Sequence, residues 1–169
     1  IRGECRPLEV TINSLFLPYE LHDFGGQISL NNTHLTARGL TARNGRTQLT
    51  VDGKCEFRDP DLPMKFEVRV TDLAIDDRFR NCAPTTWHKF YDETRPGGDI
   101  DVVADLQFDR VNRWKHKTTV RIKNGTAQHV KFPYPVRGVR GIVVQEGPLL
   151  TADLKALAGE RVAKITAEV

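Results

Sequence analysis

The segment MKFEVRVT, Met64–Thr71, alternates apolar and polar side chains without interruption. Its odd and even positions differ in kind, with Met64, Phe66, Val68 and Val70 between charged or hydroxyl side chains. Because successive side chains of a β-strand point to opposite faces, the pattern predicts a strand with one dry and one solvated face. Strands buried on both faces have continuous apolar runs, so this segment indicates an antiparallel sheet.

The same alternation recurs in RTQLTVDGKCEF (46–57), DIDVVADLQFD (99–109) and TVRIKN (119–124). Pairs that favour tight turns separate the runs: Asn31-Asn32, Asn44-Gly45, Asn124-Gly125 and Glu146-Gly147. We therefore expect about ten strands, near 21–31, 34–43, 46–58, 63–72, 99–109, 116–124, 128–132, 136–145, 148–157 and 160–169. The predicted fold is mainly β: a large curved antiparallel sheet, as a half-pipe or an open sandwich.

One interval, 73–95, departs from this pattern. Leu73, Ile75 and Phe79 are spaced for a short helix, and Pro84 is suited to the first turn of a second one. Pro96-Gly97-Gly98 ends the interval. We expect a short helical excursion between two strands.

Two short helices cannot cover the apolar face of ten strands, although domains bury such faces by packing layers together. The sheet must therefore curl on itself, pack against a neighbouring segment, or leave a groove for an apolar ligand. A protein core and a lining for acyl chains both remain open for this face. The candidate lining residues are Phe57, Met64, Phe66, Val68, Val70, Ile100, Val102, Leu106, Phe108, Val120 and Ile122.

The composition fits one soluble domain of 169 residues, with 39% apolar and 28% charged residues and a net charge of +3. No apolar run approaches the length of a membrane span. The chain has no starting Met and no signal-like front, so we expect it to be a segment of a longer protein. Cys5, Cys55 and Cys82 lack zinc-ligand spacing, and a Cys5–Cys55 disulfide is one option.

The chain also contains an internal repeat. Pro18-Tyr19 recurs as Pro133-Tyr134, and Gly26 recurs as Gly141, each 115 residues later. The similarity continues, with a one-residue deletion, so that 17–53 corresponds to 132–169. Repeats of this kind indicate stacked, nearest-neighbour architectures, here built from a multi-strand β module.

The phrase FPYPVRGVRGI (132–142), the Gly-centred turns and the excursion from DLAIDDRFRNCAP to GGDIDV resemble AsmA-like and TamB-like envelope proteins. The resemblance is to a repeat style over most of the chain. It implies an elongated β half-pipe of the bridge-like lipid transfer type, with an apolar interior. It further implies a periplasmic segment of a protein anchored at the inner membrane, acting in phospholipid transport or outer-membrane assembly. It brings no catalytic residue.

Other residues provide weak signals for chemistry. His22 and Asp23 are adjacent, so they point to opposite faces of a strand, and no nucleophile motif accompanies them. Asp99, Asp101 and Asp105 share a strand face without calcium-loop spacing, and pairing with Arg121 and Lys123 explains them more simply. We expect no enzyme activity, no metal and no cofactor.

The main basic concentration is RVNRWKHKTTVRIK (110–123), with Trp114 among the charges. Its candidates for contact with an anionic headgroup are Arg110, Arg113, Trp114, Lys115 and Lys117. A solvated hairpin tip is the plain alternative, and the low net charge argues against nucleic acid. The expected partners are phospholipid or another acyl lipid, neighbouring repeats and envelope proteins. A closed β-sandwich acting as a structural or adhesin-like module is the alternative reading of the chain.

Overall fold

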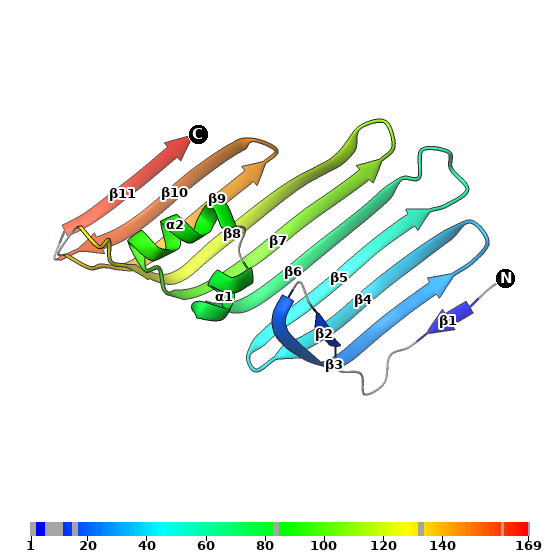
Figure 1. Ribbon diagram of the computed structural model, residues 1–169, viewed down its shortest axis with the longest axis horizontal. Coiled ribbons are helices and arrows are strands. Elements are labelled where there is room, and N and C mark those ends of the chain that lie inside the picture. The colour runs from blue at the N-terminus through cyan, green and yellow to red at the C-terminus, as the bar shows by residue number, and fades with distance from the viewer. Residues whose placement is uncertain are drawn as a thin grey trace.

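The computed structural model describes residues 3–5, 12–14, 17–82, 85–131, 134–159 and 161–168, which form one open antiparallel sheet and two helices (Figure 1). Nine strands follow one another in chain order as a meander. They are β3 (Leu17–Leu30), β4 (His34–Asn44), β5 (Thr47–Glu56), β6 (Met64–Ile75), β7 (Gly98–Asp109), β8 (Arg113–Ala127), β9 (Val136–Glu146), β10 (Leu149–Ala158) and β11 (Arg161–Glu168). Two short strands, β1 (Gly3–Cys5) and β2 (Ile12–Ser14), both pair with β3.

The mainly β fold with a large open sheet is confirmed. Within the described residues the strand order runs from β1 to β11 without closing, and no second sheet packs over the first. A closed β-sandwich, which was the alternative reading of the chain, is therefore not the arrangement of these residues.

The two ends of the sheet differ, and we name them for their connections. At the hairpin end, short turns join the strands at 31–33, 57–63, 110–112 and 147–148. Neighbouring turns are tied together, because Phe57 donates its N–H to the carbonyl of Thr33 and Arg110 donates to that of Asp61. The other end, the helical end, carries α1 (Asp77–Cys82) and α2 (Thr85–Thr94) between β6 and β7.

The excursion predicted over 73–95 is shorter than expected. Leu73 and Ile75 belong to β6, where Leu73 lies opposite Ile100 and Ile75 opposite Gly98. Their spacing also fits alternate positions of a strand, and pairing with β7 decides between the two periods. Pro84 lies outside the described residues.

Two further expectations are wrong. Asn124-Gly125 forms no turn, because β8 continues through it to Ala127 with a register shift against β9. A glycine inside a strand often marks such a bulge, and Gly125 is buried against Val139. The strand predicted over 128–132 is also missing from its described part, since residues 128–131 form a loop and a turn. Phe132 lies outside the described residues.

Register shifts bend the long strands near the helical end. They occur in β3 between His22 and Gln27, between β4 and β5, in β6 between Val70 and Leu73, and on both sides of β9. β-bulges of this kind increase the twist and bend the strand that carries the extra residue. At this end α1 contacts both β3 and β6.

Candidate functional site: the open apolar face

Cross-strand register aligns the apolar side chains into rows across one face of the sheet, which we call the apolar face. In the row nearest the hairpin end, Leu30, Leu35, Cys55, Met64, Phe108 and Trp114 are successive partners. The next row places Phe66 opposite Leu106, and further rows pair Val68 with Ala104, Val70 with Val102, and Ile100 with Ile122. Because directly opposed residues of antiparallel strands point to the same face, the rows form a continuous apolar surface.

Ten of the eleven predicted lining residues occupy these rows. Val120 lies opposite Val102, and so extends the fourth row onto β8. The exception is Phe57, which belongs to the β5–β6 turn and is 42% exposed. Alternation alone identified the ten, because a strand's period of two fixes the face once one residue is placed.

Burial on this face is shallow and falls toward the hairpin end. Ile100, near the helices, is only 3% exposed, whereas Leu30 is 40% and Trp114 is 58% exposed. Phe66, Val68 and Val102 are half-buried, and no large side chain among the described residues is fully buried. The face therefore does not form a closed core of the kind that single domains usually contain.

The exposed area agrees with this description. The chain has an accessible surface of 11865 Å², whereas a compact monomer of 19.1 kDa exposes about 8,400 Å². The excess of total surface, polar and apolar together, is about 3,500 Å². A single sheet that the described residues cover only with two short helices accounts for such an excess.

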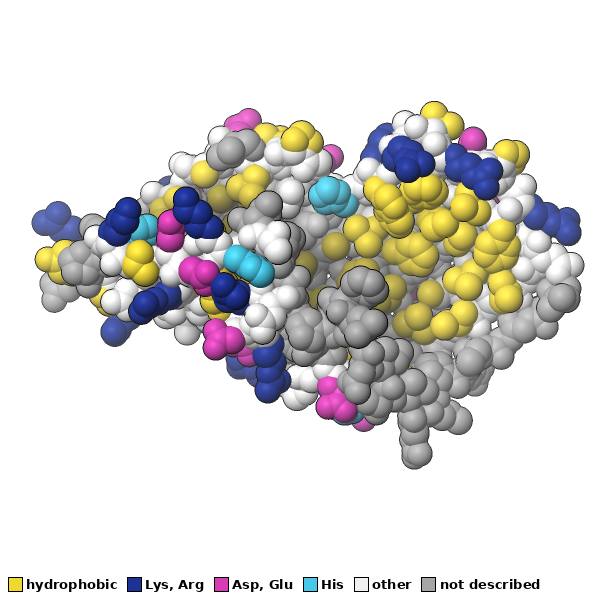
Figure 2. Space-filling view, in the orientation of Figure 1, with side chains coloured by type: hydrophobic (Ala, Val, Ile, Leu, Met, Phe, Trp, Pro, Cys, Tyr) yellow, Lys and Arg dark blue, Asp and Glu magenta, His cyan; other side chains and the backbone are white. Residues whose placement is uncertain are grey.

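The helices cover only one part of the apolar face. In Figure 1, α1 and α2 lie in front of the lower ends of β6 to β9, and the hairpin ends of β4 to β7 have no helix in front of them. The end of α2 is fixed to the segment after β8, where Gln128 and Val130 donate to the carbonyls of Thr94 and Glu93. Figure 2 shows hydrophobic side chains gathered in one patch over the uncovered strands, with Lys and Arg side chains along its upper margin.

A glycine shapes the middle of this patch. Gly53 on β5 lies opposite Phe66, and a Cβ at Gly53 would come within 2.1 Å of the Phe66 ring. The ring thus occupies the space above the Gly53 backbone, and the surface of the patch is lower on β5 than a larger residue would allow.

The predicted basic group does not form one cluster. Trp114 belongs to the apolar face, where its ring lies 5.1 Å from that of Phe108 at a tilt of 48°. Lys115 and Lys117 alternate to the opposite face, and Lys117 forms an ion pair of 3.0 Å with Glu146. Arg110 and Arg113 are exposed beside the β7–β8 turn, at the hairpin end.

The opposite face is polar, and ion pairs there join β6, β7, β8 and the β4–β5 turn. Lys123 on β8 lies 2.6 Å from an oxygen of Asp101 and 2.8 Å from an oxygen of Asp72. Burial raises the pKa of Asp101, but hydrogen bonds from Lys123 and from the N–H of Asp72 outweigh it and lower that pKa below its ordinary value. The same carboxylates raise the pKa of Lys123. Asp99 pairs with Arg46, so these aspartates bind basic side chains.

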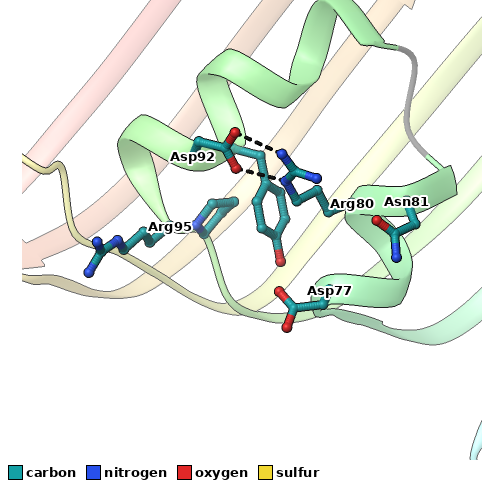
Figure 3. A pocket seen from close by; sticks show the side chains of 7 residues that line it. Asp77, Arg80, Asn81, Asp92 and Arg95 are labelled. Carbon is teal, nitrogen blue, oxygen red and sulfur yellow. Dashed lines mark hydrogen bonds and ion pairs between the residues drawn. The ribbon is translucent and has the colours of Figure 1, made fainter.

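A second hollow lies between the helices, with a volume of about 680 Å³ (Figure 3). Arg80 of α1 donates two hydrogen bonds, of 2.7 and 2.8 Å, to the carboxylate of Asp92 on α2. The hydrogen bond raises the pKa of Arg80 and lowers that of Asp92. Burial, and then the nearby Asp77, raises the pKa of Tyr91. The Arg80–Asp92 ion pair joins the two helices, and each charge neutralises the other.

Other candidate chemistry is also placed by the structure. His22 is exposed and its ring nitrogen lies 3.8 Å from Glu20, while Asp23 adopts a positive φ of 53° where β3 shifts register. Within the described ranges, no group of three or more His, Cys, Asp or Glu is placed to hold a metal ion.

Cys55 carries a free thiol. Cys5 is on β1, three strand spacings from β5, so the backbone separation is about 14 Å and too large for a disulfide. The side chains of Cys5 and Cys82 lie outside the described part.

Neither helix in the described part of the chain has the length and apolar character needed to cross a membrane. Comparisons of the chain with protein-family models, with curated proteins and with solved structures found no match.

Proposed function

We propose that this chain is a non-enzymatic segment that shields lipid acyl chains on its apolar face. In this proposal it belongs to an AsmA-like or TamB-like envelope protein, as a periplasmic segment that acts in phospholipid transport or outer-membrane assembly. The observation that carries the proposal is the shallow burial of the apolar face, over which the described residues place no helix and no second sheet at the hairpin ends of β4 to β7.

An acyl chain is a suitable cover for such a surface. The rows of apolar residues run across the strands, so they offer a continuous track from Leu30 on β3 to Trp114 on β8. Transfer of a methylene from water to an apolar surface contributes about 0.8 kcal/mol, so ten methylenes contribute about 8 kcal/mol. This contact needs no directional partner, which agrees with the apolar side chains that the face presents on β6 and β7, although His116 and Thr118 interrupt it on β8.

The margin of the face suits an anionic headgroup. Arg110 and Arg113 are exposed at the hairpin end, close in sequence to Trp114 on the apolar face. A cation at the edge of an apolar surface attracts anionic lipid, and a tryptophan there contacts both hydrocarbon and water. Lys115 and Lys117 point to the other face, and Arg113 shares their parity on β8, so we place the headgroup contact at Arg110.

Photo-crosslinking tests the proposal in cells. A photoreactive amino acid at position 66 or at position 102 should capture phospholipid, since both side chains belong to the apolar face. The matched controls are positions 65 and 103, which are the next residues on the same strands and point to the polar face. Lipid adducts at 66 and 102 but not at 65 and 103 are the expected result.

Two outcomes contradict the proposal. If positions 66 and 102 yield adducts only with protein, another polypeptide covers the apolar face. If lipid adducts form equally at 65 and 103, the label reports general membrane proximity and not a lipid held on one face.

A further inference from the structure

Three polar side chains interrupt the apolar face on β8 and β9. His116 on β8 lies opposite Leu106 of the apolar face, and Thr118 is the next residue of β8 on that face. Gln145 on β9 lies directly opposite Thr118, and so it shares the face. We call His116, Thr118 and Gln145 the polar island. On its far side Leu150 of β10 lies opposite Gln145, so apolar side chains border the island on both neighbouring strands.

The internal repeat shows that the fold does not require Gln145. Gly26 on β3 and Gly141 on β9 both have positive φ, at 100° and 147°, and a Cβ at either would lie 2.2 or 2.1 Å from a carbonyl oxygen of the next strand. Leu30 follows the first glycine by four residues, as Gln145 follows the second. Leu30 and Gln145 each lie opposite a leucine of the next strand. The sheet therefore accepts a leucine at the equivalent position of the first copy.

Each side chain of the polar island can donate a hydrogen bond. A histidine ring, a threonine hydroxyl and a glutamine amide all carry an N–H or O–H. The Gln145 amide donates a long bond of 3.5 Å to the carbonyl of Gly147, and its second N–H is left for another acceptor. Within the described residues, the His116 ring and the Thr118 hydroxyl have no hydrogen-bond partner. His116 is exposed, and the other two are half-buried.

Hydrocarbon alone is a poor cover for this island. A methylene cannot accept a hydrogen bond, so an acyl chain over the island would remove water from three donors without replacing it. The rows on β6 and β7 contain only apolar side chains, and hydrocarbon covers them without that cost. A ligand that is apolar at one end and accepts hydrogen bonds at the other fits both parts of the face.

We propose that the polar island binds the ester-linked glycerol backbone of an acyl lipid, and that the acyl chains run from there across β7 toward β4. The inference rests on the proposed function and adds the direction in which the lipid lies. Ester carbonyl oxygens accept hydrogen bonds from His116, Thr118 and Gln145. The headgroup lies toward the hairpin end, where Arg110 is exposed.

The position of a quencher along the acyl chain tests this direction. Two phospholipids are compared, one with a spin label near the ester and one with the label near the methyl end of the acyl chain. Both are added in dispersed form to the purified chain with Trp87→Phe, in which Trp114 reports from β8, two residues before His116. We expect the label near the ester to quench Trp114 at least twofold more strongly than the label near the methyl end.

A reporter on β4 should give the opposite order. Leu35→Trp, combined with Trp87→Phe and Trp114→Phe, places the sole tryptophan on the apolar face four strand spacings from β8, about 19 Å away. There the label near the methyl end should quench more strongly. Equal quenching by the two labels at both reporters, or the reverse order, overturns the inference and leaves lipid binding intact. Absence of quenching by either label contradicts the proposed function as well.

Two substitutions test the polar island itself. Thr118→Val removes the hydroxyl at nearly constant shape, and Gln145→Leu introduces the residue of the first copy. Although both make the face more apolar, together they should weaken phospholipid binding at least tenfold and abolish the difference between the two labels at Trp114. The matched control is Thr119→Val, which lies on the polar face opposite Val103 and should change neither. Unchanged or tighter binding by the double variant overturns the inference, because hydrocarbon would then cover these positions.

Discussion

An acidic substitution on the apolar face should be tolerated where the face is open and not where the helices cover it. We compare Val68→Asp with Ile100→Asp. Val68 is half-buried between Val51 and Ala104, and Ile100 is 3% exposed between Leu73 and Ile122.

The expected magnitudes follow from burial. Full burial of a valine contributes about 1.5–3 kcal/mol, so half-burial of Val68 contributes about 1 kcal/mol. Aspartate is a poor strand former, at a cost of about 1 kcal/mol, and at position 68 its carboxylate keeps contact with water. Val68→Asp should therefore lower the free energy of unfolding by about 2 kcal/mol. Ile100→Asp loses a buried side chain and buries an unpaired charge, for a loss of about 5 kcal/mol or more.

Urea unfolding followed by circular dichroism measures both changes, at constant m-value. Val103→Asp is the matched control, since Val103 is also half-buried but lies on the polar face, opposite Arg69. If Ile100→Asp does not fold, Ile100→Ala and Val68→Ala replace the pair, with expected losses of about 3 and about 1 kcal/mol. Losses at Val68 equal to those at Ile100 would refute the open face, because they would place Val68 in a closed core.

Two other predictions concern the strands that support the face. Gly141→Ala should lower the free energy of unfolding, measured by urea titration, by about 3 kcal/mol or more. Gly141 has a φ of 147°, and a Cβ added there would meet the Asp153 carbonyl. A loss under about 1 kcal/mol would contradict this reasoning. Lys123→Met should remove on the order of 1 kcal/mol near neutral pH by leaving Asp72 and Asp101 without their cation. Because the folded-state pKa of Asp101 is lowered, its stabilisation is present above the unfolded pKa near 3.8 and is lost as pH falls through the folded value. The acid side of the stability–pH curve should thus be less steep in Lys123→Met, and an unchanged slope would contradict the role of this pair.

The sequence predicted most of the sheet because alternation and turn residues agree along most of its length. Met64–Thr71 lies in a strand whose apolar side chains share one face, as expected, and the Asn44-Gly45 turn is present. The failures lie where strand pairing overrides a local signal. Asn124-Gly125 has the composition of a hairpin turn, yet Gly125 pairs with Val139 on β9 and Thr126 pairs with Gly97 on the other side, so β8 stays extended through it.

The sequence predicted which residues line the apolar face, but not how deeply each of them is buried. Parity along each strand placed ten lining residues on one face. Which of them the helices cover depends on the path of the chain between β6 and β7, which no local pattern encodes. The predicted basic cluster was wrong because of the same alternation. Trp114 and Lys115 are neighbours in sequence, so their side chains point to opposite faces of the sheet.

The most direct test of the central proposal uses Trp114, whose ring lies tilted against that of Phe108 on the apolar face and which is 58% exposed. Trp87→Phe leaves Trp114 as the sole tryptophan of the chain. Phospholipid that carries a spin label on its acyl chain is then added in dispersed form, and tryptophan fluorescence is measured. The account predicts saturable quenching of Trp114, weakened at least tenfold in affinity when Val68→Asp is added. Quenching no greater than that by a water-soluble spin label would contradict acyl-chain binding on this face.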